Sequence, residues 1–366
     1  MRIAQVAPLY ESVPPRLYGG TERVVSWLTE TLVSLGHEVT LFASGDSVTR
    51  AELVACSPKA LRLDSACIDP IAHHILMLEK ILSRAGDFDL IHFHVDYLHF
   101  PLSRRQQLPS VTTLHGRLDL PDLVPLFKEF SDMPVISISD AQRKPLPWAN
   151  WLGTVHHGLP PRSLAFNPVG GEYLAFLGRI SPEKGIDRAI EIAVRLGMKL
   201  KVAAKIDRAD QTYFERTIEP LFKHPLIEFV GEVGNGEKAE FLGNASALLF
   251  PINWPEPFGL VTIEALACGT PVIAYPFGSV PEIIIDGTCG FLVHNIDQAV
   301  DAVRRIDEID RHDCRRHFER NFTDERMAWN YLDLYERVVG QAAPASALQE
   351  GVLKWIEVES PIPSTT

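Results

Sequence analysis

Short runs of apolar and β-branched residues alternate along the chain with longer stretches in which apolar residues recur every three or four positions. The short runs predict buried β-strands and the longer stretches predict amphipathic helices, and their alternation is typical of a parallel α/β sheet. In the first part of the chain the pattern predicts helices over residues 22–35 and 71–84, and strands at residues 3–7, 39–42, 90–93, 111–114 and 135–138.

The alternation stops at residues 158–171, which are rich in proline and glycine, and then resumes. We interpret this segment as a linker between two domains. Beyond it the pattern predicts strands at residues 173–177, 200–203, 227–230, 247–250, 271–274 and 290–293, with helices over residues 186–196, 213–222 and 262–267.

A last helix is predicted over residues 324–339, because Thr323 is a favourable N-cap and apolar residues recur at helical spacing behind it. The chain is therefore divided into two doubly wound α/β domains, residues 1–165 and 166–323, with a cleft between them. The last helix, residues 324–340, is expected to cross back to the first domain. Residues 341–366 are expected to form a weakly packed tail.

The composition is that of a globular protein, with 46% hydrophobic and 22% charged residues among 366, so disordered and fibrous classes are excluded. The net charge of −12 is uneven, because residues 1–165 carry 15 basic and 17 acidic side chains (net −2), which leaves 20 and 30 (net −10) for the rest. An acidic chain repels polyphosphates, so no nucleic-acid partner is expected. The five cysteines form no C-x-x-C pair and predict neither a zinc site nor a disulfide framework.

The sequence predicts a soluble, cytoplasmic protein. No apolar run reaches the ~18–20 residues that a membrane span needs, and the first residues become polar too soon for a signal peptide. The helix at residues 71–84 has an apolar run, which we expect to pack against the first sheet rather than a bilayer. The basic pairs at residues 104–105 and 143–144 are isolated, so strong membrane binding is not expected.

Two glycine-containing loops are candidates for phosphate binding. Gly19 and Gly20 precede the first long helix, whose N-terminal amides favour an anion; a simple turn is the alternative. Arg179 and Lys184 lie five residues apart in a turn between a strand and a helix, so both cations can converge on a diphosphate; solvated surface side chains are the alternative. The P-loop pattern is not matched, which argues against a nucleoside triphosphatase.

The third candidate is a pair of glutamates. Glu256 and Glu264 lie eight residues apart across a loop and the first turn of a helix, after the predicted strand at residues 247–250. Both carboxylates can therefore point into one crevice at the carboxyl edge of the sheet. The spacing alone arises often by chance, but the Pro-Phe-Gly sequence inside it makes the motif more specific.

Together these motifs resemble those of the GT4 family of retaining glycosyltransferases, which belongs to glycosyltransferase group 1. The resemblance also rests on Thr-Leu-His-Gly at residues 113–116, Ala-Cys-Gly-Thr-Pro-Val at residues 267–272 and Gly-Ser-Val-Pro-Glu at residues 278–282. The matches run in the family's order over residues 1–340. They imply a GT-B fold, in which two Rossmann-like domains face a central cleft and the second domain holds most of a nucleotide sugar.

The family's donor-binding residues carry over to matching positions of this chain. The resemblance implies that Arg179 and Lys184 clamp the donor diphosphate. It implies that the amide of Gly20 faces the phosphates and that Glu264 binds the ribose. The resemblance also implies donor contacts from Gly19, from Phe229 and Val230 in the base-binding segment, and from Phe258, Gly259, Leu260 and Val261 beside the sugar and phosphates. Lys205 departs from the family pattern, because it ends a strand that commonly ends in glycine, and it is expected to add a contact to the donor.

The resemblance implies a retaining transferase that moves a hexose from a nucleoside-diphosphate sugar, with UDP favoured and GDP second, to a hydroxyl acceptor that the sequence does not identify. Arg179 and Lys184 would neutralise the leaving diphosphate, so no metal and no other cofactor is expected. Glu256 would orient sugar hydroxyls, and His115 would stabilise developing charge or position the sugar. Two alternatives stay open: a nucleotide-sugar epimerase on the same fold, and a catalytically silent protein that binds nucleotide sugars.

Several acidic and histidine residues are spaced like metal ligands, and we favour a structural role for them. Asp87 and Asp89 have the D-x-D spacing of metal-dependent transferases of another fold, but they precede a strand of the first domain. His92 and His94 alternate along that strand, so one is expected to face the core and one the cleft. The adjacent histidines at residues 156–157, by contrast, do not have the spacing of metal ligands. No metal site is therefore predicted.

Overall fold

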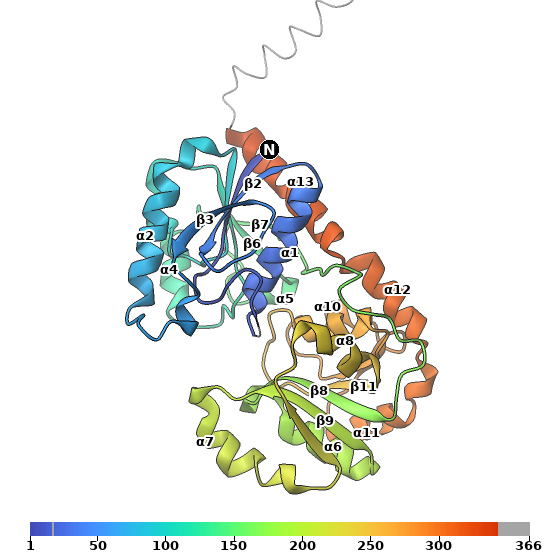
Figure 1. The fold of residues 1–366 in the computed structure, drawn as a ribbon. Helices are drawn as coiled ribbons and strands as arrows, with labels where there is room; N and C mark the ends of the chain where they lie inside the picture. The colour runs from blue at the N-terminus through green and yellow to red at the C-terminus, as the bar shows by residue number, and fades with distance from the viewer. Residues whose placement is uncertain (17, 343–366) are drawn as a thin grey trace, which may run out of the picture.

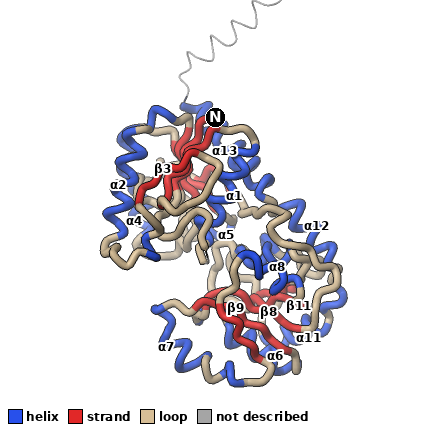
Figure 2. Tube along the Cα trace, in the orientation of Figure 1, coloured by secondary structure: helices blue, strands red, loops and turns tan. Residues whose placement is uncertain are grey.

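Two parallel β-sheets, each flanked by helices, form the two halves of the protein (Figure 1). The structure is a computed structural model that describes residues 1–16 and 18–342. The predicted tail therefore lies outside the described residues from position 343 onward. Figure 2 shows the strands as two separate groups, one in each half, with helices and loops around them.

The first sheet has seven parallel strands in the order β3-β2-β1-β4-β5-β6-β7. Its central strands are short runs of buried residues, as in β4, where every position is buried. The elements of this half are β1 (Arg2–Val6), α1 (Gly20–Ser34), β2 (Glu38–Ser44), β3 (Glu52–Ser57), α2 (Pro70–Ser83), β4 (Leu90–Phe93), α3 (Phe100–Gln106), β5 (Ser110–Thr113), α4 (Leu123–Glu129), β6 (Val135–Ser137), α5 (Asp140–Arg143) and β7 (Trp151–Thr154).

The second sheet has six parallel strands in the order β10-β9-β8-β11-β12-β13. Together with the first, it establishes the expected two-domain GT-B architecture. Its elements are β8 (Tyr173–Arg179), α6 (Ile186–Leu196), β9 (Lys199–Lys205), α7 (Gln211–Tyr213), β10 (Ile227–Gly231), α8 (Asn235–Gly243), β11 (Ala245–Phe250), α9 (Leu260–Ala267), β12 (Val272–Ala274), α10 (Val280–Ile283), β13 (Gly290–Leu292), α11 (Ile296–Arg304), α12 (Arg311–Asn321) and α13 (Asp324–Ala342).

The strands that the hydrophobic pattern missed, β3 and β7, lie at the two edges of the first sheet. Every residue of β7 is only partly buried, and β3 mixes exposed with buried positions. An edge strand has a neighbour on one side only, so it needs no continuous apolar run. Neither strand therefore carries the signal that predicted the central ones.

The helix predicted at residues 213–222 is present as an irregular helical segment and not as one α-helix. The chain forms one turn in α7, then a wider turn over Phe214–Ile218, and then a short 3₁₀ turn over Leu221–Lys223. Pro220 lies between the last two segments. Because proline has no N–H to donate, the regular α-helical hydrogen-bond pattern is interrupted there, although Glu219 and Pro220 keep helical backbone angles.

Helix α13 leaves the second domain and packs on the first, beside α1 (Figure 1). Thr323 Oγ1 caps it by accepting a hydrogen bond of 3.1 Å from the amide of Arg326. Its buried residues Met327, Tyr331 and Tyr335 belong to a hydrophobic cluster that otherwise comes from α1 and the first sheet. The core of the first domain is thus completed by α13, the last helix of the described residues.

The chain passes between the domains twice, and the two crossings lie against each other. The Leu159 amide donates to Phe322 O at 3.0 Å, and the Asp324 amide donates to Leu159 O at 3.2 Å. Gly158 allows this approach, because a Cβ at this position would lie 2.1 Å from Thr323 O. These two segments of the chain connect the domains, and they are hydrogen-bonded to each other.

Helix α2 buries only part of its apolar run. Met77, Leu78 and Ile81 pack into the core of the first domain, whereas Ile75 and Leu76 are 52% and 60% exposed. The expected packing against the first sheet is therefore found on one face of the helix. In the part of the chain that the structure describes, no helix combines the length and the apolar character needed to cross a bilayer.

Replacing Gly158 by alanine is expected to destabilise the fold, because the new Cβ collides with the backbone of the second crossing. Overpacking of this kind costs ~1–3 kcal/mol. Thermal unfolding followed by circular dichroism should show it as a lower midpoint. Gly86→Ala is the matched control, since no atom lies within 4 Å of a Cβ there; equal midpoints for the two variants would contradict close packing of the crossings.

Candidate active site

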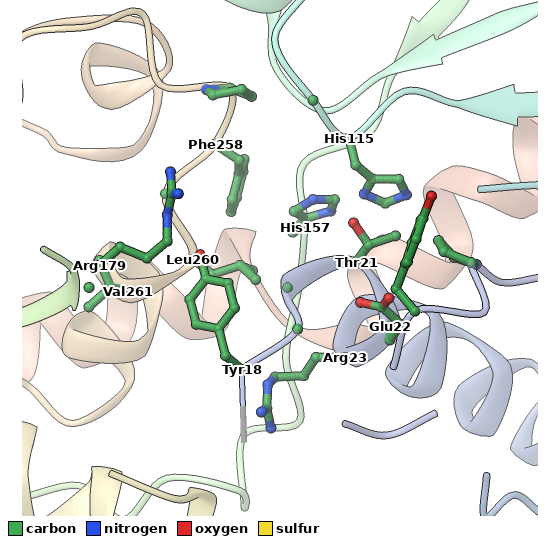
Figure 3. Close-up of a pocket in the computed structure, with 18 of the residues that line it drawn as sticks. Tyr18, Thr21, Glu22, Arg23, His115, His157, Arg179, Phe258, Leu260 and Val261 are labelled. Atoms are coloured by element: carbon green, nitrogen blue, oxygen red, sulfur yellow. The ribbon is translucent and has the colours of Figure 1, made fainter. Parts of the chain in front are cut away.

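A cavity of about 730 Å³ lies between the two domains and is lined by both (Figure 3). The first domain contributes the loop before α1 and the segments that follow β1, β4 and β5. The second contributes the ends of β8, β9 and β11 and the start of α9. Parallel strands bring the loops that follow them to one edge of a sheet, so the motifs meet here although they are far apart in sequence. The volume suits a small-molecule ligand.

Lys184 and Glu256 form an ion pair in the cavity wall, between Lys184 Nζ and Glu256 Oε2. Only 14% and 10% of their side chains are exposed. Trp254 Nε1 donates to the same carboxylate oxygen at 3.0 Å, and Lys184 Nζ lies 4.9 Å from the centroid of the Trp254 ring. Gly185 sets the turn, because its φ is +70° and an added Cβ would lie 2.1 Å from Pro251 O.

Arg179 and Lys205 share the carboxylate of Asp207. Arg179 Nη1 lies 3.4 Å from Asp207 Oδ2, and Lys205 Nζ lies 2.9 Å from Asp207 Oδ1. Burial raises the pKa of Asp207, but hydrogen bonds and charge from Lys205 and Arg179 outweigh it and hold that pKa below its ordinary value. Lys205 Nζ also lies 5.3 Å from the centroid of the Tyr18 ring. These cations therefore line the cavity as a paired cluster rather than as solvated side chains.

Lys238 is a further cation of the site that the sequence motifs did not reveal. Its Nζ lies 2.6 Å from Glu264 Oε1, and the side chains of the pair are 16% and 6% exposed. Lys238 comes from α8 and Glu264 from α9, so no short spacing links them. A lysine in an otherwise unremarkable helix carried no signal that could have distinguished it from a surface residue.

Two helices begin at the cavity without a side-chain cap. Gly19 precedes α1, Gly259 precedes α9, and neither start has a capping side-chain hydrogen bond. Amides in the first turn of a helix favour anions. A Cβ added at Gly20 would find Leu260 Cδ1 as its nearest neighbour, at 3.5 Å. The loop therefore leaves room for a ligand beside the backbone of Gly20.

His115 and His157 lie next to each other in the wall of the cavity (Figure 3). Their ring centroids are 5.3 Å apart with the planes at 20°, and the His157 ring meets Phe258 edge-on at 4.8 Å. Burial lowers the pKa of His115 to about 3 and that of His157 well below its ordinary value. Both rings are thus neutral near pH 7, so they can form hydrogen bonds but carry no imidazolium charge. His157 belongs to the pair that sequence reasoning set aside.

The structure brings most of the predicted site residues to this one cavity. Those that line it are Gly19, Gly20, His115, Arg179, Lys184, Lys205, Glu256, Phe258, Gly259, Leu260, Val261 and Glu264.

Phe229 and Val230, expected in the base-binding segment, are not among the residues that line the cavity. They lie in the edge strand β10, whose pairing with β9 shifts register just beyond Phe229. Phe229 stacks instead on Phe222, with ring centroids 5.1 Å apart. Glu232 and Val233, slightly further along the chain, line the cavity.

The residues with metal-like spacing lie where they were expected. Asp89 bonds to Arg2 at 2.8 Å at the amino end of β4, the end opposite the cavity. His94 lines the cavity, whereas His92 is enclosed between Thr113 and Tyr335. Over residues 1–16 and 18–342, no three His, Cys, Asp or Glu side chains are grouped as a metal site.

Both domains match known glycosyltransferase families. Residues 165–321 match the family described as "Glycosyl transferases group 1", and residues 18–156 match "Glycosyltransferase Family 4". Over 329 residues the chain is 27% identical to the phosphatidyl-myo-inositol mannosyltransferase of Mycolicibacterium smegmatis, which covers 80% of this chain and 81% of that protein.

Solved structures share the fold over nearly the whole chain. The sucrose-phosphate synthase of Thermosynechococcus elongatus superposes with a TM-score of 0.76 at 20% identity, covering 93% of this chain and 100% of that one. HepE of Anabaena, solved in complex with UDP and glucose, superposes with a TM-score of 0.71 at 17% identity, covering 91% and 98%. With each domain matched in turn and the architecture shared, this chain belongs to the group 1 glycosyltransferases of GT-B fold.

Proposed function

We propose that the protein is a retaining transferase that moves a hexose from a nucleoside-diphosphate sugar to a hydroxyl acceptor without a metal ion. The observation that carries this proposal is the convergence of Arg179, Lys184 and Lys205 with the starts of α1 and α9 on one cavity. Side-chain cations and helix N-termini together neutralise a diphosphate.

A UDP-sugar is the favoured donor and a GDP-sugar the second choice. HepE, which has the same fold, was solved with UDP and glucose. The family resemblance assigns the ribose to Glu264, which lies in the first turns of α9. The base then extends toward Glu232 and Val233, at the end of the cavity formed beyond β10.

The chemistry requires stabilisation of the leaving diphosphate. When the bond between the anomeric carbon and the phosphate oxygen breaks, negative charge grows on the diphosphate, and preorganised cations lower the barrier. Glu256 pairs with Lys184, so a bound phosphate would take over Lys184 and leave Glu256 to accept hydrogen bonds from sugar hydroxyls. The acceptor oxygen then bonds to the anomeric carbon on the face from which the diphosphate leaves, and its proton departs with the diphosphate.

The acceptor binds on the side of the cavity that the first domain forms. Tyr10, Asp96 and Tyr97 line it there, and the two tyrosine side chains are partly exposed. Hydroxyl and carboxylate oxygens accept hydrogen bonds from a polyhydroxylated molecule, and the tyrosine rings offer flat apolar faces. This arrangement suits a sugar or another polyol.

The function is tested by donor screening followed by product analysis. UDP-, GDP-, ADP- and dTDP-sugars are compared by thermal shift; a donor at 100 times its dissociation constant stabilises the fold by ~2.7 kcal/mol. The donor that binds is then incubated with a panel of sugar acceptors. A glycoside that keeps the anomeric configuration of the donor supports the proposal. Conversion of the donor to its epimer, or binding without any turnover, would replace it by one of the two alternatives.

Lys184→Ala is expected to lower the transfer rate by a factor on the order of 10²–10³, as the loss of one preorganised charge-stabilising group does in other enzymes. Binding of the nucleoside diphosphate should weaken as well. Steady-state kinetics and calorimetry measure the two effects. Lys201→Ala is the control, because Lys201 lies in the same domain but outside the cavity, with Nζ 3.9 Å from Glu228 Oε1. Equal transfer rates in the two variants would contradict the assignment of Lys184 to the active site.

Transfer is expected to continue in excess EDTA, because side-chain cations and helix N-termini supply the positive charge that a metal ion would otherwise bring. The measurement is the initial rate with and without the chelator, after dialysis against it. Loss of turnover that added Mg²⁺ or Mn²⁺ restores would contradict metal independence.

A further inference from the structure

A chain of buried polar side chains connects the cavity with helix α13. His115 Nε2 lies 2.9 Å from His94 Nδ1, and His94 Nε2 lies 2.9 Å from Gln5 Oε1. The amide nitrogen of Gln5 donates to the Tyr335 hydroxyl at 3.2 Å. His94 is 2% exposed, and Gln5 and Tyr335 are fully buried. Each of these groups therefore depends on its neighbours, rather than on water, for hydrogen bonds.

The orientation of Gln5 fixes the direction of every bond toward the cavity. Since its amide nitrogen faces Tyr335, its carbonyl oxygen faces His94 and accepts a proton from His94 Nε2. Burial holds the pKa of His94 well below its ordinary value, so this ring is neutral and carries no second proton. His94 Nδ1 is then an acceptor, and the proton of the neutral His115 ring must lie on Nε2.

One consequence appears at the other nitrogen of His115. In the part of the chain that the structure describes, His115 Nδ1 is buried and has no hydrogen-bond partner. A buried polar atom left unpaired costs free energy, and such atoms often mark a place for a ligand. With its proton on Nε2, His115 offers Nδ1 as a lone pair, which accepts a hydrogen bond but cannot donate one.

A second branch of the chain agrees with this direction. The Tyr335 hydroxyl, which accepts from Gln5, lies 2.6 Å from His92 Nδ1 and gives its proton to it. His92 Nε2 then donates to Thr113 Oγ1 at 2.7 Å, and that hydroxyl donates to Tyr331 at 3.0 Å. The His92 and His94 rings and the hydroxyls of Tyr335 and Thr113 each accept one bond and donate the next, so these four groups support one another.

We propose that His94 is a positioning residue that fixes the tautomer of His115, so that His115 Nδ1 accepts a hydrogen bond from a hydroxyl of the donor sugar. Gln5 sets the direction of the hydrogen bonds from Tyr335 to His115, and Tyr335 connects these side chains to α13. The inference rests on the proposed function for the identity of the ligand, but the state of the His115 ring is independent of it. In the other tautomer Nδ1 would carry the proton and donate to the oxygen of that hydroxyl, which would then point its own proton elsewhere.

Two amide variants at position 94 separate the two contacts of the ring. The terminal group of asparagine reaches the place of Nδ1, so His94→Asn keeps an oxygen that accepts from His115. The terminal group of glutamine reaches the place of Nε2, so His94→Gln keeps the contact with Gln5 and loses the one with His115. We expect kcat to fall ~10–100-fold in His94→Gln, the range seen when an orienting partner of a site histidine is lost. The fall should be smaller in His94→Asn, which keeps an acceptor for the His115 proton but loses the contact with Gln5 that sets the direction.

His99→Gln is the matched control. His99 is also a buried histidine of the first domain, 1% exposed, but it bonds to Ser103 at 2.8 Å and Thr112 at 2.7 Å and does not line the cavity. It should lower the thermal midpoint as His94→Gln does while leaving kcat unchanged. Equal kinetic losses in these two variants would show that His94 acts only through stability, and would overturn the proposal.

Nitrogen-15 NMR of the imidazole rings reads the tautomer directly. His115 of the wild-type protein should be protonated on Nε2 only, and His94→Gln should populate both tautomers. The Nδ1 resonance should move with UDP-glucose and not with UDP, which lacks the sugar. A proton on Nδ1 in the wild type, an unchanged tautomer in His94→Gln, or an equal shift with UDP alone would overturn the assignment.

Tyr335→Phe provides a milder perturbation if the position-94 variants do not fold. It removes only the hydroxyl that accepts from Gln5, so the amide of Gln5 can reverse and the His115 tautomers should mix. If His115 keeps its wild-type tautomer in the folded Tyr335→Phe variant, the hydrogen bonds through Gln5 do not fix that tautomer and the proposal is contradicted. If the wild type transfers no sugar, the proposed function fails, whereas the NMR readout of His115 still decides the inference.

Discussion

The cavity depends on one electrostatic constraint, which is that cations shielded from water need a counter-charge even when no donor is present. Lys184 meets it with Glu256 and Lys238 meets it with Glu264. An unpaired buried charge would cost several kcal/mol, so these pairs keep the charge of the cavity wall close to neutral and hold its side chains in place. In the proposed function, a diphosphate would exchange with these carboxylates as the partner of the cations, and the released carboxylates would be available to hydroxyl groups.

The features that the sequence predicts most successfully are those that a single short segment determines, such as a strand or a loop motif. The central strands are runs of buried residues, and the glycine and charged motifs follow them at the carboxyl ends, so the architecture and most cavity residues could be inferred from pattern and family resemblance. The predictions weaken at sheet edges. Strands β3 and β7 carry no clear apolar run. In the edge strand β10, Phe229 stacks on Phe222, and neither Phe229 nor Val230 lines the cavity.

Contacts between distant segments left no local signal. Lys238 is recognisable only through Glu264, which lies on another helix, and His157 only through its position beside His115 and Phe258. The chain from His115 to Tyr335 joins four separate elements, and its members look like ordinary core residues when they are read singly. Burial and direction of hydrogen bonding, which determine what these groups can do, exist only after the chain has folded.

The return of α13 to the first domain reverses the order in which the two domains are finished during synthesis. The first sheet leaves the ribosome early, but Met327, Tyr331 and Tyr335 of its core arrive last. Until then the apolar surface of α1 and the sheet that they cover stays in contact with water. The second domain lies between these segments and completes its own sheet sooner. The nascent first domain is thus the part of the chain that needs protection from aggregation until α13 has been synthesised.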